Sequence, residues 1–264
     1  MKRDDLLHPI ISGNKGRKLK YLLQDAKQKS CDTLVSMGGN WSNHLHALAY
    51  AGKELGFKTI GYVRAHPEQP LTSTLDDCIQ WGMQLKFFNR QDYTQLRQDN
   101  HWRSKQSSIP KSYWVAEGGF SKLAIQGVED IAQEVDQFYD YVLTGVGSGA
   151  TLLGLAKGFN QSKLIGVAAF SGAEYLTEQL TQQEPMLSNW RLDTEHHCGG
   201  FAKSNEQLKN ALNAFKKYNG FAIDSLYNGK TFLALLDSIE HRKIAQGSSI
   251  LLINTGGMQG ERTI

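Results

Sequence analysis

The chain has 264 residues, of which 40% are hydrophobic, and this is enough for a large core in one or two α/β domains. Its 29 basic and 26 acidic residues are interspersed and leave a net charge of only +3, which argues against a nucleic-acid-binding protein. No apolar run approaches the roughly 18 residues of a membrane span, and the start of the chain lacks the apolar stretch of a signal peptide. A cytoplasmic protein without a membrane partner is therefore expected.

The hydrophobic pattern alternates between short β-type runs and amphipathic helices. Such alternation predicts an α/β fold with parallel strands that are covered on both faces. The polar stretch 89–111 is the least regular, although 91–98 could add a helix. The predicted strands are 32–37, 58–64, 84–88, 112–116, 140–146, 163–170 and 248–257, and the predicted helices are 15–26, 42–56, 73–82, 123–135, 147–159, 204–218 and 230–243.

Lys15 lies within the apolar face of the first predicted helix. Leu19, Leu22 and Ala26 follow it at helical spacing, whereas Arg17 and Lys20 project toward other sides as solvated cations would. Lys15 either extends its ammonium to water along the surface or lies in a pocket. In a pocket, desolvation would lower the pKa of its amine and make it a nucleophile able to form a Schiff base.

A glycine-rich loop at 145–154 follows a predicted strand and begins a helix, so several backbone N–H groups converge there on an anion. The spacing also fits a dinucleotide fingerprint, as in a nicotinamide-dependent oxidoreductase, but no acidic residue ends the next strand, 163–170. A monophosphate explains the same glycines. The residues expected to hold it are Gly147, Ser148, Gly149, Ala150 and Thr151.

A second glycine loop, within 36–48, ends another predicted strand, where open α/β sheets place their ligands. Ser42 and Asn43 either cap the following helix or offer polar groups to a ligand. A nucleophilic lysine, a monophosphate loop and a polar glycine loop together suggest pyridoxal 5'-phosphate, whose aldehyde needs the amine and whose phosphate needs the loop.

The three cysteines, Cys31, Cys78 and Cys198, are odd in number and scattered, so a disulfide framework is not expected. His196, His197 and Cys198 are consecutive, and neighbouring residues rarely face one metal ion. We therefore expect no metal site.

Five blocks spread over the chain resemble the ordered landmarks of the pyridoxal-phosphate enzymes grouped as 1-aminocyclopropane-1-carboxylate deaminase and D-cysteine desulfhydrase. They are 2–26, 35–49, 146–154, 224–230 and 254–260. The resemblance implies the tryptophan synthase β-type fold (fold type II), with two open, mostly parallel α/β domains and the cofactor in the cleft between them. It implies a larger cofactor domain of 1–30 and 120–264, a smaller domain of 31–119, and a homodimer.

The resemblance also assigns site residues. Lys15 matches the lysine that carries the cofactor, Ser42 a serine that takes part in proton transfer, and Asn43 an asparagine that contacts the cofactor ring. The loop from Gly147 to Thr151 matches the phosphate-binding loop, and Tyr227 matches the active-site tyrosine.

Departures from the deaminase pattern favour the desulfhydrase-like branch. Deaminases carry glutamate where this chain has Asn228, leucine where it has Thr255, and a second tyrosine where it has Phe201. A hydroxyl such as that of Thr255 beside the cofactor ring supports a weaker electron sink, which suffices when thiolate leaves. The expected reaction is β-elimination from a small amino acid such as D-cysteine, giving a 2-oxo acid, ammonia and sulfide.

Two alternatives remain open: a 1-aminocyclopropane-1-carboxylate deaminase, and a divergent or truncated relative without catalysis. The second follows from Gly16, which stands directly after the lysine where relatives carry a larger residue, and from the short segment before the first block. The roles of His44 and His46 are also left open.

Overall fold

The computed structural model describes residues 1–66 and 68–262, and it contains two separate parallel sheets. Every strand pair in both sheets is parallel. The five-stranded sheet has the order β1 (Lys2–Arg3), β9 (Ile250–Asn254), β6 (Tyr141–Val146), β7 (Lys163–Ala168) and β8 (Trp190–Asp193). The four-stranded sheet has the order β4 (Met83–Phe88), β3 (Lys58–Arg64), β2 (Thr33–Gly39) and β5 (Ser112–Trp114).

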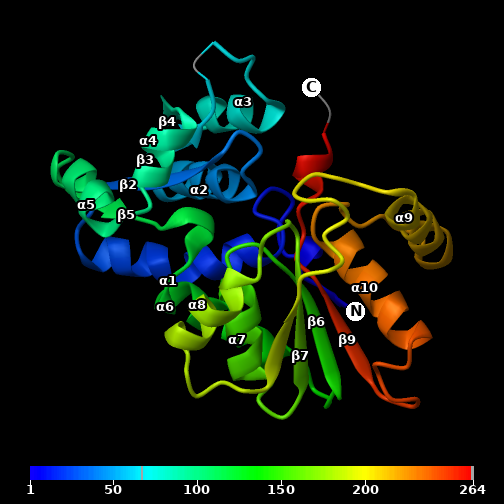
Figure 1. Cartoon of the computed structure of the whole chain (residues 1–264). Helices are drawn as coiled ribbons and strands as arrows, with labels where there is room; N and C mark the ends of the chain where they lie inside the picture. Colours follow the sequence, from blue (N-terminus) through cyan, green and yellow to red (C-terminus); the bar gives the residue numbers. More distant parts are fainter. Residues whose placement is uncertain (67, 263–264) are drawn as a thin grey trace.

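The helices cover both faces of each sheet, and the two sheets form two halves of the molecule (Figure 1). No helix in the described part of the chain is long and apolar enough to cross a membrane. The α-helices are α1 (Asn14–Gln28), α2 (Asn43–Leu55), α3 (Ser73–Gln80), α4 (Arg90–Gln95), α5 (Asp99–Ser107), α6 (Lys122–Glu129), α7 (Ala150–Gly158), α8 (Tyr175–Gln183), α9 (Glu206–Asn219) and α10 (Asn228–Glu240). The 3-10 helices are η1 (Asp4–Leu6), η2 (Glu117–Gly119), η3 (Asp130–Glu134) and η4 (Met258–Glu261).

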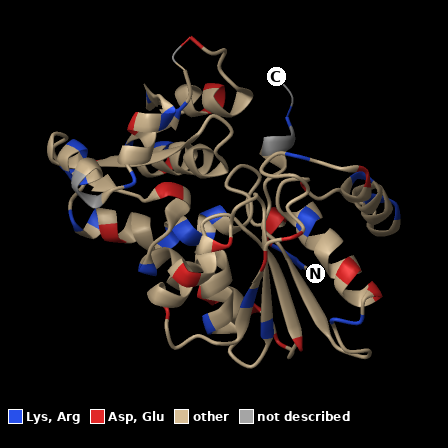
Figure 2. Cartoon of the chain, viewed as in Figure 1, with Lys and Arg blue, Asp and Glu red and all other residues tan. Residues whose placement is uncertain are grey.

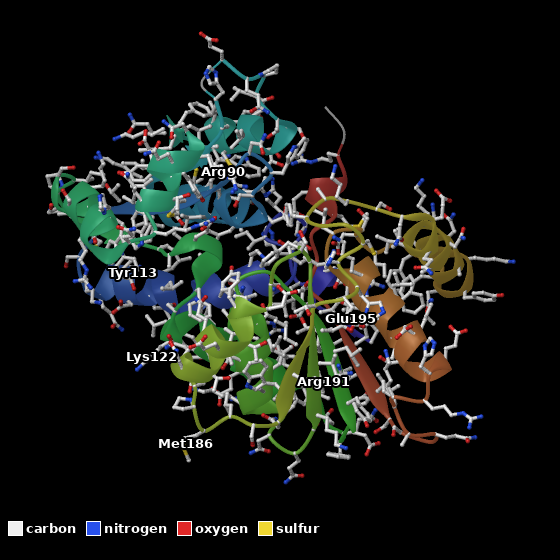
Figure 3. All side chains as sticks on the ribbon, viewed as in Figure 1. Arg90, Tyr113, Lys122, Met186, Arg191 and Glu195 are labelled. Atoms are coloured by element: carbon white, nitrogen blue, oxygen red, sulfur yellow. The ribbon has the colours of Figure 1, made fainter. Side chains whose placement is uncertain are left out.

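Helix α1 runs between the two halves (Figure 1). Its apolar residues Leu19, Leu22 and Ala26 are buried in the core on the α2 side of the four-stranded sheet. Tyr113 of β5 lies beside it, and its hydroxyl donates to the carboxylate of Asp25 on α1 at 2.6 Å (Figure 3). The division of the chain into 1–30 with 120–264 and 31–119 stays a prediction, although the two sheets are built from strands on either side of those boundaries.

All seven predicted strands are present, and all seven predicted helices have counterparts. Among the strands and α-helices absent from the prediction, β1 has two residues, β8 is a half-exposed edge strand and α5 is polar. Helix α8 was also missed, although it buries Leu176 and Leu180 at helical spacing. The additional helix that the sequence allowed within 91–98 corresponds to α4.

Basic and acidic residues are scattered over both halves without a block of one sign (Figure 2). One basic residue, Arg17, is not the solvated cation that the sequence predicted. Arg17 is 8% exposed rather than solvated, because η1 and η3 bring two carboxylates onto the same side of α1. It donates to Asp4 at 2.6 and 2.9 Å and to Glu134 at 2.8 Å, and hydrogen bonding to Arg17 and Lys2 lowers the pKa of Glu134 to about 2.

The consecutive residues His196, His197 and Cys198 were examined in the sequence as a metal site, and in the structure His196 bonds a nearby carboxylate. The His196 ring lies 2.8 Å from a carboxylate oxygen of Asp193, and the three cysteines are free. Among the described residues no group of three or more His, Cys, Asp or Glu side chains could hold a metal ion.

Gly16 is not required by the backbone of α1, so Gly16→Ala is expected to raise the free energy of unfolding by about 0.5 kcal/mol. A Cβ there would lie 3.4 Å from Ile11 Cγ2, an ordinary contact, at the edge of a cavity of about 320 Å³. Urea unfolding measures the effect. The contrasting control is Gly127→Ala in α6, where a Cβ would lie 2.0 Å from the Arg17 carbonyl oxygen and should destabilise the protein. A Gly16→Ala protein of lower stability would contradict the expectation.

Candidate active site

The first turn of α1 packs directly against the turn that follows β9. Gly13, at φ 69°, precedes the helix, and a Cβ there would lie only 1.8 Å from the carbonyl oxygen of Thr255. The Asn14 N–H donates to that same oxygen at 3.3 Å. This close approach brings Lys15, near the start of the chain, next to the 255–257 turn near its end.

The amine of Lys15 is hydrogen-bonded and desolvated. It donates to Asn14 Oδ1 at 2.8 Å, and Asn14 Nδ2 donates to Thr151 Oγ1 at 2.8 Å, which links the lysine to the glycine loop before α7. Burial lowers the pKa of Lys15 to about 8, and the negative charge of Asp224 opposes this shift. A part of the side chain remains accessible. The amine is therefore partly neutral near pH 7.

The glycine loop between β6 and α7 has the form of an anion site. Gly149 precedes α7 at φ 89°, and a Cβ there would lie 2.4 Å from Leu180. The Ser148 hydroxyl is buried and has no hydrogen-bond partner among the described residues. Thr151 lies in the first turn of α7 and is 3% exposed. The loop thus offers a free hydroxyl and a helix N-terminus to an anion.

Ser42 and Asn43 come from the other half of the molecule. Ser42 caps α2, because its Oγ accepts the Leu45 N–H at 3.2 Å, and its hydroxyl proton remains available to donate. Asn43 is 9% exposed, and its Oδ1 is buried with no hydrogen-bond partner in the described part of the chain. A Cβ on Gly257 would lie 3.3 Å from Asn43 Nδ2, so Asn43 faces the 255–257 turn.

Tyr227 directly precedes α10, and its ring lies against the glycine loop. A Cβ on Gly147 would lie 3.4 Å from the Tyr227 hydroxyl, and one on Gly145 would lie 2.8 Å from Tyr227 Cβ. Phe201 contacts the Tyr227 ring edge-to-face at 6.1 Å between centroids. Burial raises the pKa of Tyr227, and the charges of Asp224 and Glu117 add to the effect, so the phenol stays a hydrogen-bond donor.

Lys18 is a site residue that the sequence analysis missed. It is 4% exposed, its amine donates to the Gly118 carbonyl oxygen at 3.3 Å, and no acid pairs with it in the described ranges. Burial and the charge of Lys15 lower the pKa of Lys18 well below its usual value. Gly118, to which Lys18 donates, lies next to the glycine loop between β6 and α7, because a Cβ on Gly118 would lie 3.2 Å from the Ser148 hydroxyl. Lys18 is therefore close to that loop. The sequence signal for this residue was its position three residues after Lys15, because residues three apart are neighbours on the surface of a helix.

His44 and His46 both lie in buried positions. The Ser36 hydroxyl donates to the Val115 carbonyl oxygen at 2.7 Å, so at 2.9 Å it must accept the proton of His44 Nε2. Burial and the nearby lysines lower the pKa of His44 to about 3, which leaves its ring neutral. His46 instead bonds Asp77 at 2.9 Å.

A family model described as "Pyridoxal-phosphate dependent enzyme" matches residues 1–256. The chain belongs to this family. It is 28% identical over 98% of its length to a protein of Pyrococcus horikoshii named "Putative 1-aminocyclopropane-1-carboxylate deaminase", of which it covers 84%. A protein of the same name from Thermotoga maritima is 26% identical, with coverages of 98% and 88%.

Solved structures agree with this assignment. One described as "the ACC deaminase homologue" has a TM-score of 0.85 and 28% identity, with 98% of this chain and 84% of that chain covered. A serine racemase from Dictyostelium discoideum has the same fold, with a TM-score of 0.68 at 17% identity over 97% of this chain and 86% of that one. The expected fold type II and the cofactor, pyridoxal phosphate, are therefore confirmed.

The residues brought together here fit that cofactor. Lys15 offers a partly neutral amine for its aldehyde, and the Ser148 hydroxyl, the N-terminus of α7 and the unpaired Lys18 suit a phosphate. The unpartnered Oδ1 of Asn43 can turn toward a ring substituent. The individual roles of Lys15, Ser42, Asn43, Tyr227, Thr255 and the loop from Gly147 to Thr151 stay predictions.

Proposed function

We propose that the protein is a lyase that acts on a small amino acid, and that it carries out D-cysteine desulfhydrase-like β-elimination. D-cysteine and water would give pyruvate, ammonia and sulfide. The homodimer and the cytoplasmic location stay predictions, and a mass measurement in solution would test the first.

The environment of Asn228 is the observation that supports this choice. Its Nδ2 donates to the carboxylate of Asp224 and, at 2.9 Å, to the Gly256 carbonyl oxygen, while its Oδ1 accepts the Thr255 N–H at 3.0 Å. A glutamate in this position would bring a second carboxylate beside Asp224 and Gly256. The site is thus built for a neutral Asn228 with Thr255, as expected when the leaving group is a good one.

The side chains have distinct tasks in this reaction. Pyridoxal phosphate, when bound, supplies the electron sink that stabilises negative charge at the substrate α-carbon. Lys15 would provide the amine that holds the cofactor, and its free amine would take the proton from the substrate α-carbon. Ser42 and Tyr227 carry hydroxyl protons for the substrate carboxylate and the departing sulfur. Lys18 and the loop from Gly147 neutralise the phosphate.

The relatives favour a second candidate, since both are named as deaminases of 1-aminocyclopropane-1-carboxylate. That reaction opens an unactivated ring to give 2-oxobutanoate and ammonia. Purified protein loaded with pyridoxal phosphate should be incubated separately with D-cysteine, L-cysteine and 1-aminocyclopropane-1-carboxylate. We expect pyruvate with stoichiometric sulfide from D-cysteine. 2-Oxobutanoate from the cyclic substrate alone would establish the deaminase, and no product from any of them would indicate a relative without catalysis.

A pair of cap variants separates the chemistry of Ser42 from its structural role. Ser42→Ala and Asn205→Ala each remove an N-cap, since Asn205 Oδ1 accepts the Leu208 N–H at 2.9 Å, and each should cost about 1 kcal/mol of stability. Helix α9, which Asn205 caps, lies at the outer edge of the molecule (Figure 1). Only Ser42→Ala should lower D-cysteine turnover, by about 100-fold as for loss of a proton-transfer group. Equal turnover in the two variants would remove Ser42 from the mechanism.

A further inference from the structure

Asp224 is a buried carboxylate to which neither the resemblance nor the proposed reaction gives a role. It is 1% exposed, and its side chain accepts the backbone N–H groups of Tyr227 at 2.7 Å and Asn228 at 3.2 Å. Its own carbonyl oxygen accepts the Gly229 N–H at 2.8 Å. One residue therefore satisfies three N–H groups where α10 begins, and fixes the backbone that carries the Tyr227 ring.

Asp224 is also joined to the turn on which α1 rests. Asn228 Nδ2 lies between two acceptors, the Asp224 carboxylate and the Gly256 carbonyl oxygen, whereas Asn228 Oδ1 faces the Thr255 N–H. Only one orientation of the amide satisfies all three groups. The carboxylate thereby holds the 255–257 turn through Asn228, and Thr255 in turn accepts the N–H of Asn14, next to Lys15.

The position of the carboxylate places its charge at the centre of the site. A Cβ on Gly257 would lie 3.6 Å from Asp224 Cγ and 3.3 Å from Asn43 Nδ2, so Asp224 and Asn43 meet at the same glycine from opposite halves of the molecule. Burial disfavours the ammonium form of Lys15, and the charge of Asp224 favours it. Thr255 and Asn228 bring no charge of their own, and the titratable side chains of Lys18 and His44, which interact with Lys15, bring no negative charge.

We propose that Asp224 is a positioning residue of the active site, which holds Tyr227 and the 255–257 turn in place and supplies the negative charge that balances the buried amine of Lys15. The proposal rests on Lys15 being the reacting amine, and it does not depend on which amino acid is the substrate. It predicts that removal of the charge makes Lys15 more reactive at neutral pH, although asparagine keeps only one of the two acceptor oxygens.

The test is the pH dependence of Lys15 modification in the full chain freed of cofactor. Three proteins are compared: wild type, Asp224→Asn and the control Asp237→Asn, which makes the same change at a partly exposed position of α10. Each is treated briefly with trinitrobenzenesulfonate, and the Lys15 peptide is quantified by mass spectrometry. For wild type the midpoint should lie near pH 8. Asp224→Asn should lower it by about one pH unit, so that labelling at pH 7 rises about fivefold, while Asp237→Asn leaves it unchanged.

A purely structural role would lower the melting temperature of Asp224→Asn without moving the midpoint, and this result would overturn the proposal. Asp224→Glu gives an independent check if the first variant does not fold. It keeps the charge on a longer arm, so its midpoint should stay close to that of wild type. A fall of a full pH unit in Asp224→Glu would equally contradict the role of the charge. None of these readouts requires turnover, so they stand apart from the test of the proposed reaction.

Discussion

Lys15→Ala is expected to abolish the visible absorption of the lysine-bound cofactor and to lower turnover by about 1,000-fold or more. The amine of Lys15 is partly neutral because burial lowers its pKa to about 8, and Asn14 links it by hydrogen bonds to Thr151 in the first turn of α7. Absorption spectra recorded after addition of pyridoxal phosphate measure the first effect, and product formation measures the second.

The fold should survive this change. Alanine removes a desolvated amine, and the hydrogen bond lost from Asn14 Oδ1 costs only about 1 kcal/mol, so the melting temperature should shift by a few degrees at most. Lys27→Ala is the matched control, because Lys27 is an exposed lysine on the same helix. A Lys15→Ala protein that still gave the absorption band would assign the cofactor to another lysine, and the buried Lys18 would be the first to examine.

Gly13→Ala is expected to cost at least about 3 kcal/mol of unfolding free energy and to prevent cofactor binding. Gly13 has φ 69° and ψ −145°, a region that essentially only glycine adopts, and a Cβ would overlap the Thr255 carbonyl oxygen at 1.8 Å. To relieve the overlap, the start of α1 must move away from the 255–257 turn, and Lys15 would move with it.

Gly56→Ala separates backbone strain from this overlap. Gly56 follows α2 at φ 74°, but a Cβ there would meet no atom within 4 Å, so its substitution should cost only about 1 kcal/mol. Urea unfolding of both variants, with cofactor binding followed by absorption, gives the comparison. Equal losses in the two proteins would show that the contact between Gly13 and Thr255 does not hold the site together.

The hydrophobic pattern was sufficient to predict seven of the nine strands in the described part of the chain. Strand β3 was predicted with the bounds that the structure shows, and β2 and β6 within two residues, because strands buried on both faces are nearly continuous apolar runs. The period could not predict β1 or β8: a strand of two residues has no period, and an edge strand buries only part of its side chains. Strand β1 pairs with β9, which is remote in the sequence, and β8 pairs with β7 across a connection that contains α8.

For the site, the sequence by itself identified the family, the cofactor and the group of candidate residues, because Lys15, the glycine loops and Tyr227 lie in local motifs whose order along the chain is specific. Tertiary structure decided what surrounds them. Lys18 resembled any other basic residue of an amphipathic helix until its amine was seen to be buried without an acid, and Arg17 was expected in water until Asp4 and Glu134 were seen to enclose it. Burial and charge balance depend in part on residues far apart in the sequence, such as Arg17 and Glu134, which are 117 positions apart, and no local pattern contains such pairs.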